Sequence, residues 1–272
     1  MIDFEILTRR YFSKGVPCPY KLKTGIEIYI YPILVKDCED YEDCKSILEI
    51  DKRNINDEKV ISMSQLDFLE MTFSNDMIID EANQITLGEN ELQKFKEIFS
   101  LCLHEDYVAI TKHNGKNVVV IAEKVGDGEN DFVVKYIISN KDYLNIVKII
   151  LYQNDVDYNG EYINPDVLKE YNEYMSIKSK GISIPSFEKQ KVFVLSRYRC
   201  TLEDLNNMTY RFFNMLLSEY RDIELYYINN MYKTSEKFDV KEDFPYPLYK
   251  PKEDRFKDLF MSTESLNRQL GN

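Results

Sequence analysis

The stretch Tyr107-Val-Ala-Ile-Thr-Lys-His-Asn-Gly-Lys-Asn-Val-Val-Val-Ile-Ala122 decides the fold class of this chain. Two runs rich in β-branched residues lie on either side of Asn114-Gly115, a dipeptide that favours a tight turn between antiparallel strands. The sequence therefore predicts a β-hairpin here. A third strand is predicted over 132–138, and the apolar spacing over 89–103 predicts a helix before the hairpin.

The segments upstream of this hairpin alternate between strand and helix patterns. Residues 16–31 predict a first hairpin that turns at Thr24-Gly25, because alternating β-branched residues follow this turn. Helices are predicted from Asp37, as the capping residue, to about Ile50 and over 64–75. Short strands are predicted at 78–79 and 84–87.

The segments downstream of the hairpin are mainly helical. The run 142–153 predicts a largely buried helix, and Asn164-Pro165 predicts the start of another that ends near Gly181. Thr201 and Asp204 form a capping-box pattern, which predicts a long helix through Leu217. A last helix is predicted over 222–233, while 187–199 fits either a helix or an extended chain.

These elements together predict an α+β fold. It has an N-terminal β-hairpin unit, an inserted small α+β domain and a helical C-terminal half. The predicted parts are 1–76 for the hairpin with its helices, 77–153 for the insertion, 154–243 for the helical domain and 244–272 for an extended tail.

Composition excludes several classes of protein. The 272 residues include 47 acidic and 35 basic side chains, for a net charge of −12, so we do not expect binding to nucleic acid. There is no apolar run of about 18 residues and no signal-peptide pattern, so we expect a soluble, unsecreted protein without a membrane span. Nine carboxylates crowd into 37–58, which fits either a solvated helix face or a docking surface for a basic partner.

Cysteine and histidine do not form a recognisable reactive motif. The five cysteines are scattered and lack a Cys-x-x-Cys pair, and there are only two histidines, His104 and His113. We therefore expect reduced, mostly buried thiols. The chain also lacks a Gly-x-Ser-x-Gly elbow, a phosphate-binding loop and a His-Glu-x-x-His motif, so an enzyme is not expected.

Residues 155–166 match the ligand spacing of an EF-hand calcium loop. Oxygen-bearing residues occupy loop positions one, three and five, glycine occupies position six, and a carboxylate occupies position twelve. Against this interpretation, position twelve is Asp, a proline adjoins it, and no second loop exists to pair with it. We expect no cofactor, with Ca²⁺ as the alternative. The candidate metal residues are Asp155, Asp157, Asn159, Glu161 and Asp166.

The C-terminal tail is rich in aromatic residues around Phe244-Pro-Tyr-Pro-Leu-Tyr249. Proline stiffens this segment, and tyrosine and phenylalanine are enriched at protein interfaces, so it is a candidate docking segment. Packing against its own chain explains the pattern equally well. The candidate partner-binding residues are Phe244, Tyr246, Tyr249, Phe256 and Phe260.

Several dispersed segments resemble one known family. They are Val16-Pro-x-Pro-Tyr-Lys-Leu-Lys-x-Gly25, Ile30-Tyr-Pro32, Val35-Lys-Asp37, 61–69, 142–154 and 208–217. This pattern resembles the phage tail-morphogenesis proteins, a group of tail assembly chaperones and T4-type baseplate-hub proteins.

The resemblance implies a non-enzymatic protein of a tailed phage or a related contractile particle. Its partners would be other tail or baseplate subunits, including tape-measure or tail-tube proteins. Its location would be the host cytoplasm during assembly or the virion tail. Whether it is an assembly chaperone or a permanent virion component stays open.

Overall fold

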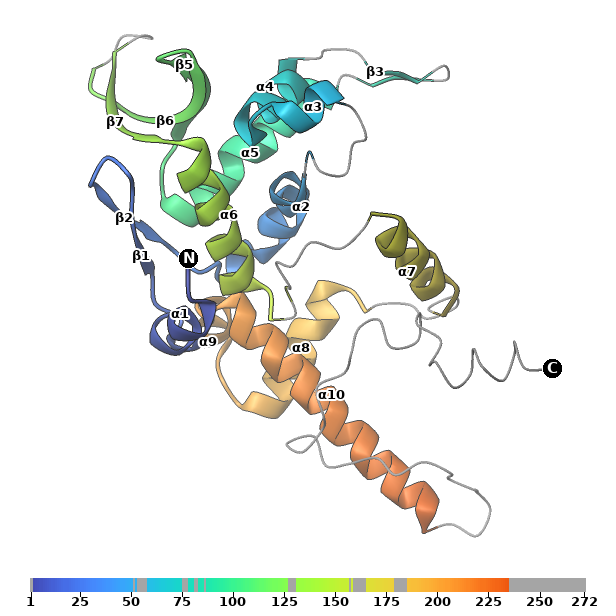
Figure 1. Ribbon diagram of the computed structural model, residues 1–272. Coiled ribbons are helices and arrows are strands. Elements are labelled where there is room, and N and C mark those ends of the chain that lie inside the picture. The colour runs from blue at the N-terminus through green and yellow to red at the C-terminus, as the bar shows by residue number, and fades with distance from the viewer. Residues whose placement is uncertain are drawn as a thin grey trace, which may run out of the picture. The chain divides into compact units, whose positions relative to one another are not determined.

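The computed structural model describes residues 2–50, 52, 58–74, 78–80, 83–85, 87–126, 131–156, 158, 165–178 and 185–234 (Figure 1). The chain has an α+β fold with a helical C-terminal half. It divides into two compact units, one formed by 1–160 with 199–215 and the other by 161–198 with 216–272. This grouping differs from the predicted parts, because the predicted insertion at 77–153 falls inside the first unit.

The chain begins with a short helix and the predicted first hairpin. Helix α1 (Phe4–Arg10) starts at Asp3, whose side chain accepts a hydrogen bond from the Ile6 amide at 3.0 Å. A 3₁₀ turn, η1 (Phe12–Lys14), follows. Strands β1 (Cys18–Lys21) and β2 (Glu27–Ile30) then pair antiparallel, with Cys18 opposite Ile30. The glycine of the predicted turn, Gly25, has φ +91°, which a residue with a side chain rarely adopts.

The predicted hairpin at 107–122 forms the first two strands of a three-stranded antiparallel sheet. Its strands are β5 (Tyr107–His113), β6 (Lys116–Lys124) and β7 (Phe132–Ile138), in that order. The turn residues Asn114 and Gly115 have φ values of 51° and 75°, as the dipeptide predicts. A β-bulge interrupts the β6–β7 pairing between Ile121 and Ala122.

Helices cover one side of this sheet (Figure 1). They are α4 (Gln65–Ser74), α5 (Leu87–Leu103) and α6 (Asn140–Asn154). The predicted strand at 84–87 is shorter than expected, because β4 (Asn83–Ile85) ends before Leu87, the first residue of α5. Strand β4 pairs with β3 (Ile78–Asp80).

The core of the first unit lies between α5, α6 and α2 (Cys38–Glu49). The rings of Phe95 and Phe99 lie 4.8 Å apart, and Phe99 stacks on Tyr143 of α6 at 6.3 Å. Asp37 occupies the N-cap position of α2 but makes no side-chain capping bond, because the 3₁₀ turn η2 (Val35–Asp37) leads directly into the helix. A short helix, α3 (Glu58–Ser62), precedes α4.

The C-terminal helices differ from the prediction at one break. The capping box at Thr201 forms, but its helix α9 (Leu202–Asn206) is short, so the prediction of a continuous helix through Leu217 is wrong. The chain leaves the helix because residues 208–210 pair with the segment after β2: the Val35 amide donates to the Met208 carbonyl at 2.9 Å, and the Tyr210 amide to the Ile33 carbonyl at 2.8 Å.

Helix α10 (Tyr210–Lys233) then runs without the predicted break before Asp222. Residues 187–199, left open by the sequence, form helix α8 (Phe187–Tyr198). Helix α7 (Pro165–Lys178) starts at the predicted proline, whereas the predicted boundary residues Asn164 and Gly181 lie outside the described residues. Within the described ranges, no helix is both long enough and apolar enough to cross a membrane.

Candidate functional site

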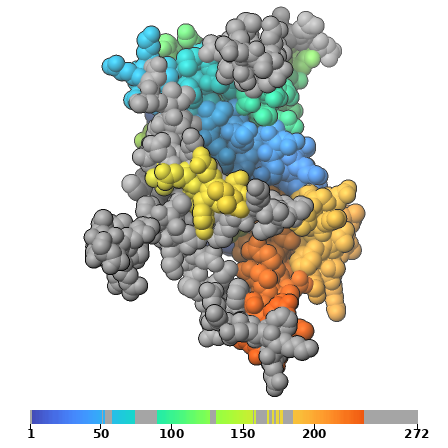
Figure 2. Space-filling view, turned by 90° about the vertical axis from the view of Figure 1, so that its right-hand side faces the viewer, coloured from blue at the N-terminus to red at the C-terminus, as the bar shows by residue number. Residues whose placement is uncertain are grey.

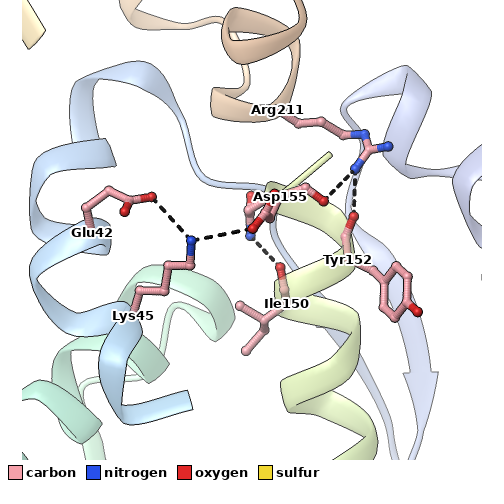
Figure 3. A network of polar contacts seen from close by, with 7 residues as sticks. Glu42, Lys45, Ile150, Tyr152, Asp155 and Arg211 are labelled. Carbon is pink, nitrogen blue, oxygen red and sulfur yellow. Dashed lines mark hydrogen bonds and ion pairs between the residues drawn. The ribbon is translucent and has the colours of Figure 1, made fainter. Parts of the chain in front are cut away.

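The predicted calcium loop begins where α6 ends, and its first residue is already engaged by two cations (Figure 3). The carboxylate of Asp155 lies 3.5 Å from the ammonium of Lys45 on α2, which also lies 3.8 Å from Glu42. The Arg211 guanidinium donates to the carbonyls of Tyr152 and Asp155 at 2.8 and 3.2 Å. A cation at a helix C-terminus satisfies free carbonyls and the helix dipole, so this arrangement stabilises the end of α6.

This geometry opposes calcium binding at the start of the loop. A divalent cation would have to displace Lys45 from Asp155, and it would be repelled by Arg211. Asp157, Asn159 and Glu161 lie outside the described residues, and Asp166 lies in α7 without a described side chain. Among the side chains that the structure does describe, no group of three or more His, Cys, Asp or Glu could hold a metal ion.

Asn154, the last residue of α6, joins this helix to the segment after the first hairpin. Its side chain is fully buried, and its Oδ1 accepts a hydrogen bond from the Ile33 amide at 2.8 Å. Its Nδ2 donates to the Ile150 carbonyl at 2.9 Å. Nothing in the sequence points to this residue, because an amide at the end of an apolar run gives no sign of its distant partner.

Asp142 makes a second junction near the beginning of α6, where it is 3% exposed. One carboxylate oxygen accepts from the Tyr20 hydroxyl at 3.0 Å, and the other from the Ser139 hydroxyl at 2.7 Å and the Lys23 amide at 3.4 Å. Asn145 in turn donates to the Tyr20 hydroxyl at 2.9 Å. Since both oxygens are satisfied, this buried carboxylate fastens the first hairpin to α6.

The thiols and imidazoles are placed as structural groups. Burial raises the pKa of the Cys18 thiol to about 11 and that of Cys44 to about 12, and it raises the pKa of Cys102 further. These thiols therefore stay protonated at neutral pH. A cysteine acts as a nucleophile only as the thiolate, so these three are not placed to do so. His104 directly follows α5 and stacks on Tyr31 with ring centroids 3.8 Å apart, and His113 is exposed beside the hairpin turn.

The prediction of reduced, mostly buried thiols is confirmed. None of the five cysteines forms a disulfide: Cys18, Cys38, Cys44 and Cys102 are buried, and Cys200 is partly exposed. The five predicted partner-binding aromatics of the tail, Phe244 to Phe260, lie outside the described residues.

The three-stranded sheet has one face that no described helix covers. Strand pairing and alternation place Val108, Val119, Ile121 and Ile138 on the face toward the helices, and each is at most 5% exposed. The opposite face, which we call the outer sheet face, is mostly apolar although it is open to solvent. Its exposed and half-buried residues are Tyr107, Ala109, Thr111, Val120, Ala122, Phe132, Val134 and Ile137, whereas Val118 on the same side of β6 is buried.

The outer sheet face could not be read from the sequence. An antiparallel sheet with one solvated face normally alternates apolar and polar residues, whereas Val118-Val-Val-Ile-Ala122 is continuously apolar. Such a run predicts burial on both faces. Within this run Val118, Val119 and Ile121 are buried, and the exposed apolar side chains lie on the neighbouring strands, where Tyr107, Phe132 and Val134 are exposed by 42%, 41% and 54%.

Comparison with protein-family models, with curated proteins and with solved structures finds no match to this chain.

Proposed function

We propose that this chain is a non-enzymatic component of a phage tail or baseplate, or a factor that assembles one, and that it acts through protein–protein contacts. The main support for a role in protein–protein contacts is the outer sheet face, because contiguous exposed apolar surface marks interaction sites on folded proteins. The phage setting rests on the dispersed sequence resemblance at 16–37, 61–69, 142–154 and 208–217.

The acidic helix α2 offers a second surface for contacts. Its apolar side is buried in the core, while Glu39, Asp40, Glu42, Asp43 and Glu49 are exposed. Figure 2 shows the blue segment that contains α2 at the molecular surface. This surface fits a basic partner and fits a solvated helix face equally well, so it supports the proposal less strongly than the outer sheet face does.

The proposal is tested by mass spectrometry of purified phage particles and of tail assemblies isolated from infected cells. We expect this chain to co-purify with tape-measure, tail-tube or baseplate subunits. Its presence in finished particles would make it a virion component, and its presence in immature assemblies alone would make it an assembly factor. Recovery only as a free monomer, in a cell that carries no prophage, would overturn the proposal.

Calcium binding by the loop at 155–166 is the alternative function. Calorimetric titration with Ca²⁺ separates the two, and Lys45→Ala sharpens the test because it frees Asp155 from its ion pair. A bound calcium ion would give heat and raise the melting temperature, with tighter binding in the variant. We expect neither protein to respond, which would remove the calcium alternative.

A further inference from the structure

We infer that the outer sheet face receives one amphipathic helix of a partner protein, with an apolar stripe flanked by carboxylates. This inference rests on the proposed contact function and names the chemistry of the partner. Three features of the sheet support this inference: its dimensions, the charges at its ends and its aromatic pair.

The dimensions of the outer sheet face fit a single helix. Three strands span about 10 Å between the outer two, which matches the diameter of about 10–12 Å of a helix with its side chains. Strand β6, from Lys116 to Lys124, extends about 26 Å at ~3.3 Å per residue, which is the length of a helix of about 18 residues. An added strand would pair with an edge and leave the face uncovered, whereas a helix covers it.

The charges on this face select an acidic helix. Alternation along β6 places Lys116 at one end of the outer sheet face and Lys124 at the other, and His113 lies opposite Lys116. Within the described residues of β5, β6 and β7 the one carboxylate is Glu123, which alternation places on the opposite side. An apolar strip with a lysine at each end complements an apolar stripe flanked by carboxylates.

An aromatic pair provides a rigid anchor for the partner. Tyr107 and Phe132 come from the two outer strands, yet their ring centroids are 4.7 Å apart with the planes at 59°. The rings therefore lean toward each other across β6, on the side where Ala122 leaves room. Exposed aromatic side chains of low conformational freedom commonly carry much of the binding free energy at interfaces.

The test uses the full chain and two model peptides of about 18 residues, each a helix with a leucine stripe. Glutamates flank the stripe in one peptide and lysines in the other. We expect fluorescence anisotropy to show binding of the glutamate peptide at least about ten-fold tighter than that of the lysine peptide. Equal affinities, or no binding of the glutamate peptide, would overturn the inference.

Two neighbouring valines provide matched variants. Val134 and Val133 are both 54% exposed on β7, but only Val134 lies on the outer sheet face. We expect Val134→Asp to weaken binding of the glutamate peptide at least about ten-fold and Val133→Asp to leave it unchanged. Equal losses in the two variants, with melting temperatures that match each other, would contradict the assignment of the face.

Charge reversal tests the lysines in the same way. Lys116→Glu combined with Lys124→Glu should make the chain prefer the lysine peptide. Lys112→Glu is the control, because alternation places Lys112 on the other side of β5. A preference for the glutamate peptide that survives the double reversal would overturn the role of the two lysines.

Two further outcomes separate this inference from the proposed function. If the wild-type chain dimerises in light scattering and Val134→Asp alone makes it monomeric, a second copy occupies the face and the inference is wrong. If Val134→Asp still co-purifies with tail subunits as the wild type does, the proposed function stands and the inference fails. Loss of co-purification in Val134→Asp, but not in Val133→Asp, supports both.

Discussion

At the residue scale, buried polar side chains near the two ends of α6 hold the first unit together. Asp142 near the start of the helix accepts hydrogen bonds from Tyr20 and Lys23 of the first hairpin. Asn154 at the other end bonds to Ile33, just beyond this hairpin. Removal of the Asn154 side chain leaves the buried Ile33 amide without a partner, which costs more than the bond itself contributes.

We predict that Asn154→Ala lowers the free energy of unfolding by about 2–3 kcal/mol, because it strands the buried Ile33 amide and leaves a small cavity. Urea unfolding followed by circular dichroism measures this change. The control is Asn229→Ala, since Asn229 also donates to the carbonyl four residues earlier at 2.9 Å but lies on the surface of α10. A loss of under ~0.5 kcal/mol in Asn154→Ala would show that the junction contributes little.

We also predict that thiol reactivity divides the cysteines. A disulfide reagent at pH 8 should label the partly exposed Cys200 first and label the four buried cysteines only on unfolding. Cys200→Ser should remove the fast phase, and a fast phase that remains in this variant would contradict the prediction.

The same burial predicts a loss of stability at alkaline pH. The unfolded thiols lose their protons near the ordinary pKa of 9.0, whereas native Cys18 keeps its proton up to a pKa of about 11. Because the unfolded state then binds fewer protons, the free energy of unfolding falls as the pH rises above about 9, by at most ~1.4 kcal/mol per pH unit for each such thiol. Thermal melts between pH 8 and about 11 check this trend, and a rising melting temperature would contradict it.

At the element scale, the break between α9 and α10 shows where local signals fail. The capping box at Thr201 is correct, and helical spacing continues through Met208, so the sequence predicts an unbroken helix. The chain leaves the helix because backbone groups of Ile33 and Val35 pair with residues 208–210. These partners lie more than 170 residues away in the sequence, beyond the reach of any local pattern.

A glycine near this break gives an element-scale prediction. Gly15 has φ +64°, and a Cβ at this position would lie 2.8 Å from Cγ2 of Thr209. Gly15→Ala therefore combines backbone strain of about 1–2 kcal/mol with a steric clash that costs about 1 kcal/mol more. Gly25→Ala, with φ +91° and no neighbour within 4 Å, carries the backbone strain alone.

Chemical unfolding should therefore rank Gly15→Ala below Gly25→Ala in stability. Thr209→Ser in the Gly15→Ala background removes Cγ2 and should restore the part of the stability that the clash costs. If the two single variants are equally destabilised, or if Thr209→Ser gives no recovery, the close approach of these two residues does not limit stability.

At the scale of the whole molecule, the two compact units differ in how much apolar surface they bury. In the first unit, α6 alone has Tyr143, Ile146, Ile149 and Ile150 buried among its apolar residues. In the described part of the second unit, Val194 is the apolar side chain that is buried. Burial of apolar surface is the main stabilising contribution to folding, so the two units should open with different free energies.

Hydrogen exchange measured by mass spectrometry tests this difference. We predict that amides of α6 exchange at least about 100-fold more slowly than those of α8, equivalent to ~2.7 kcal/mol in opening free energy. Ile150→Ala should accelerate exchange in α6 and leave α8 unchanged, and Val194→Ala should do the reverse. Equal acceleration everywhere in both variants would mean that the chain opens as one cooperative body.

The sequence by itself determined both hairpin turns, the strands of the three-stranded sheet and most of the helices. These features depend on residues close together in the chain, such as Asn114-Gly115 with its positive φ angles. Tertiary structure alone decided where the buried amide of Asn154 bonds, why Lys45 holds the first residue of the predicted calcium loop, and which face of the apolar sheet stays open. Each of these depends on contacts between distant segments, and alternation within a strand does not show which side the helices will cover.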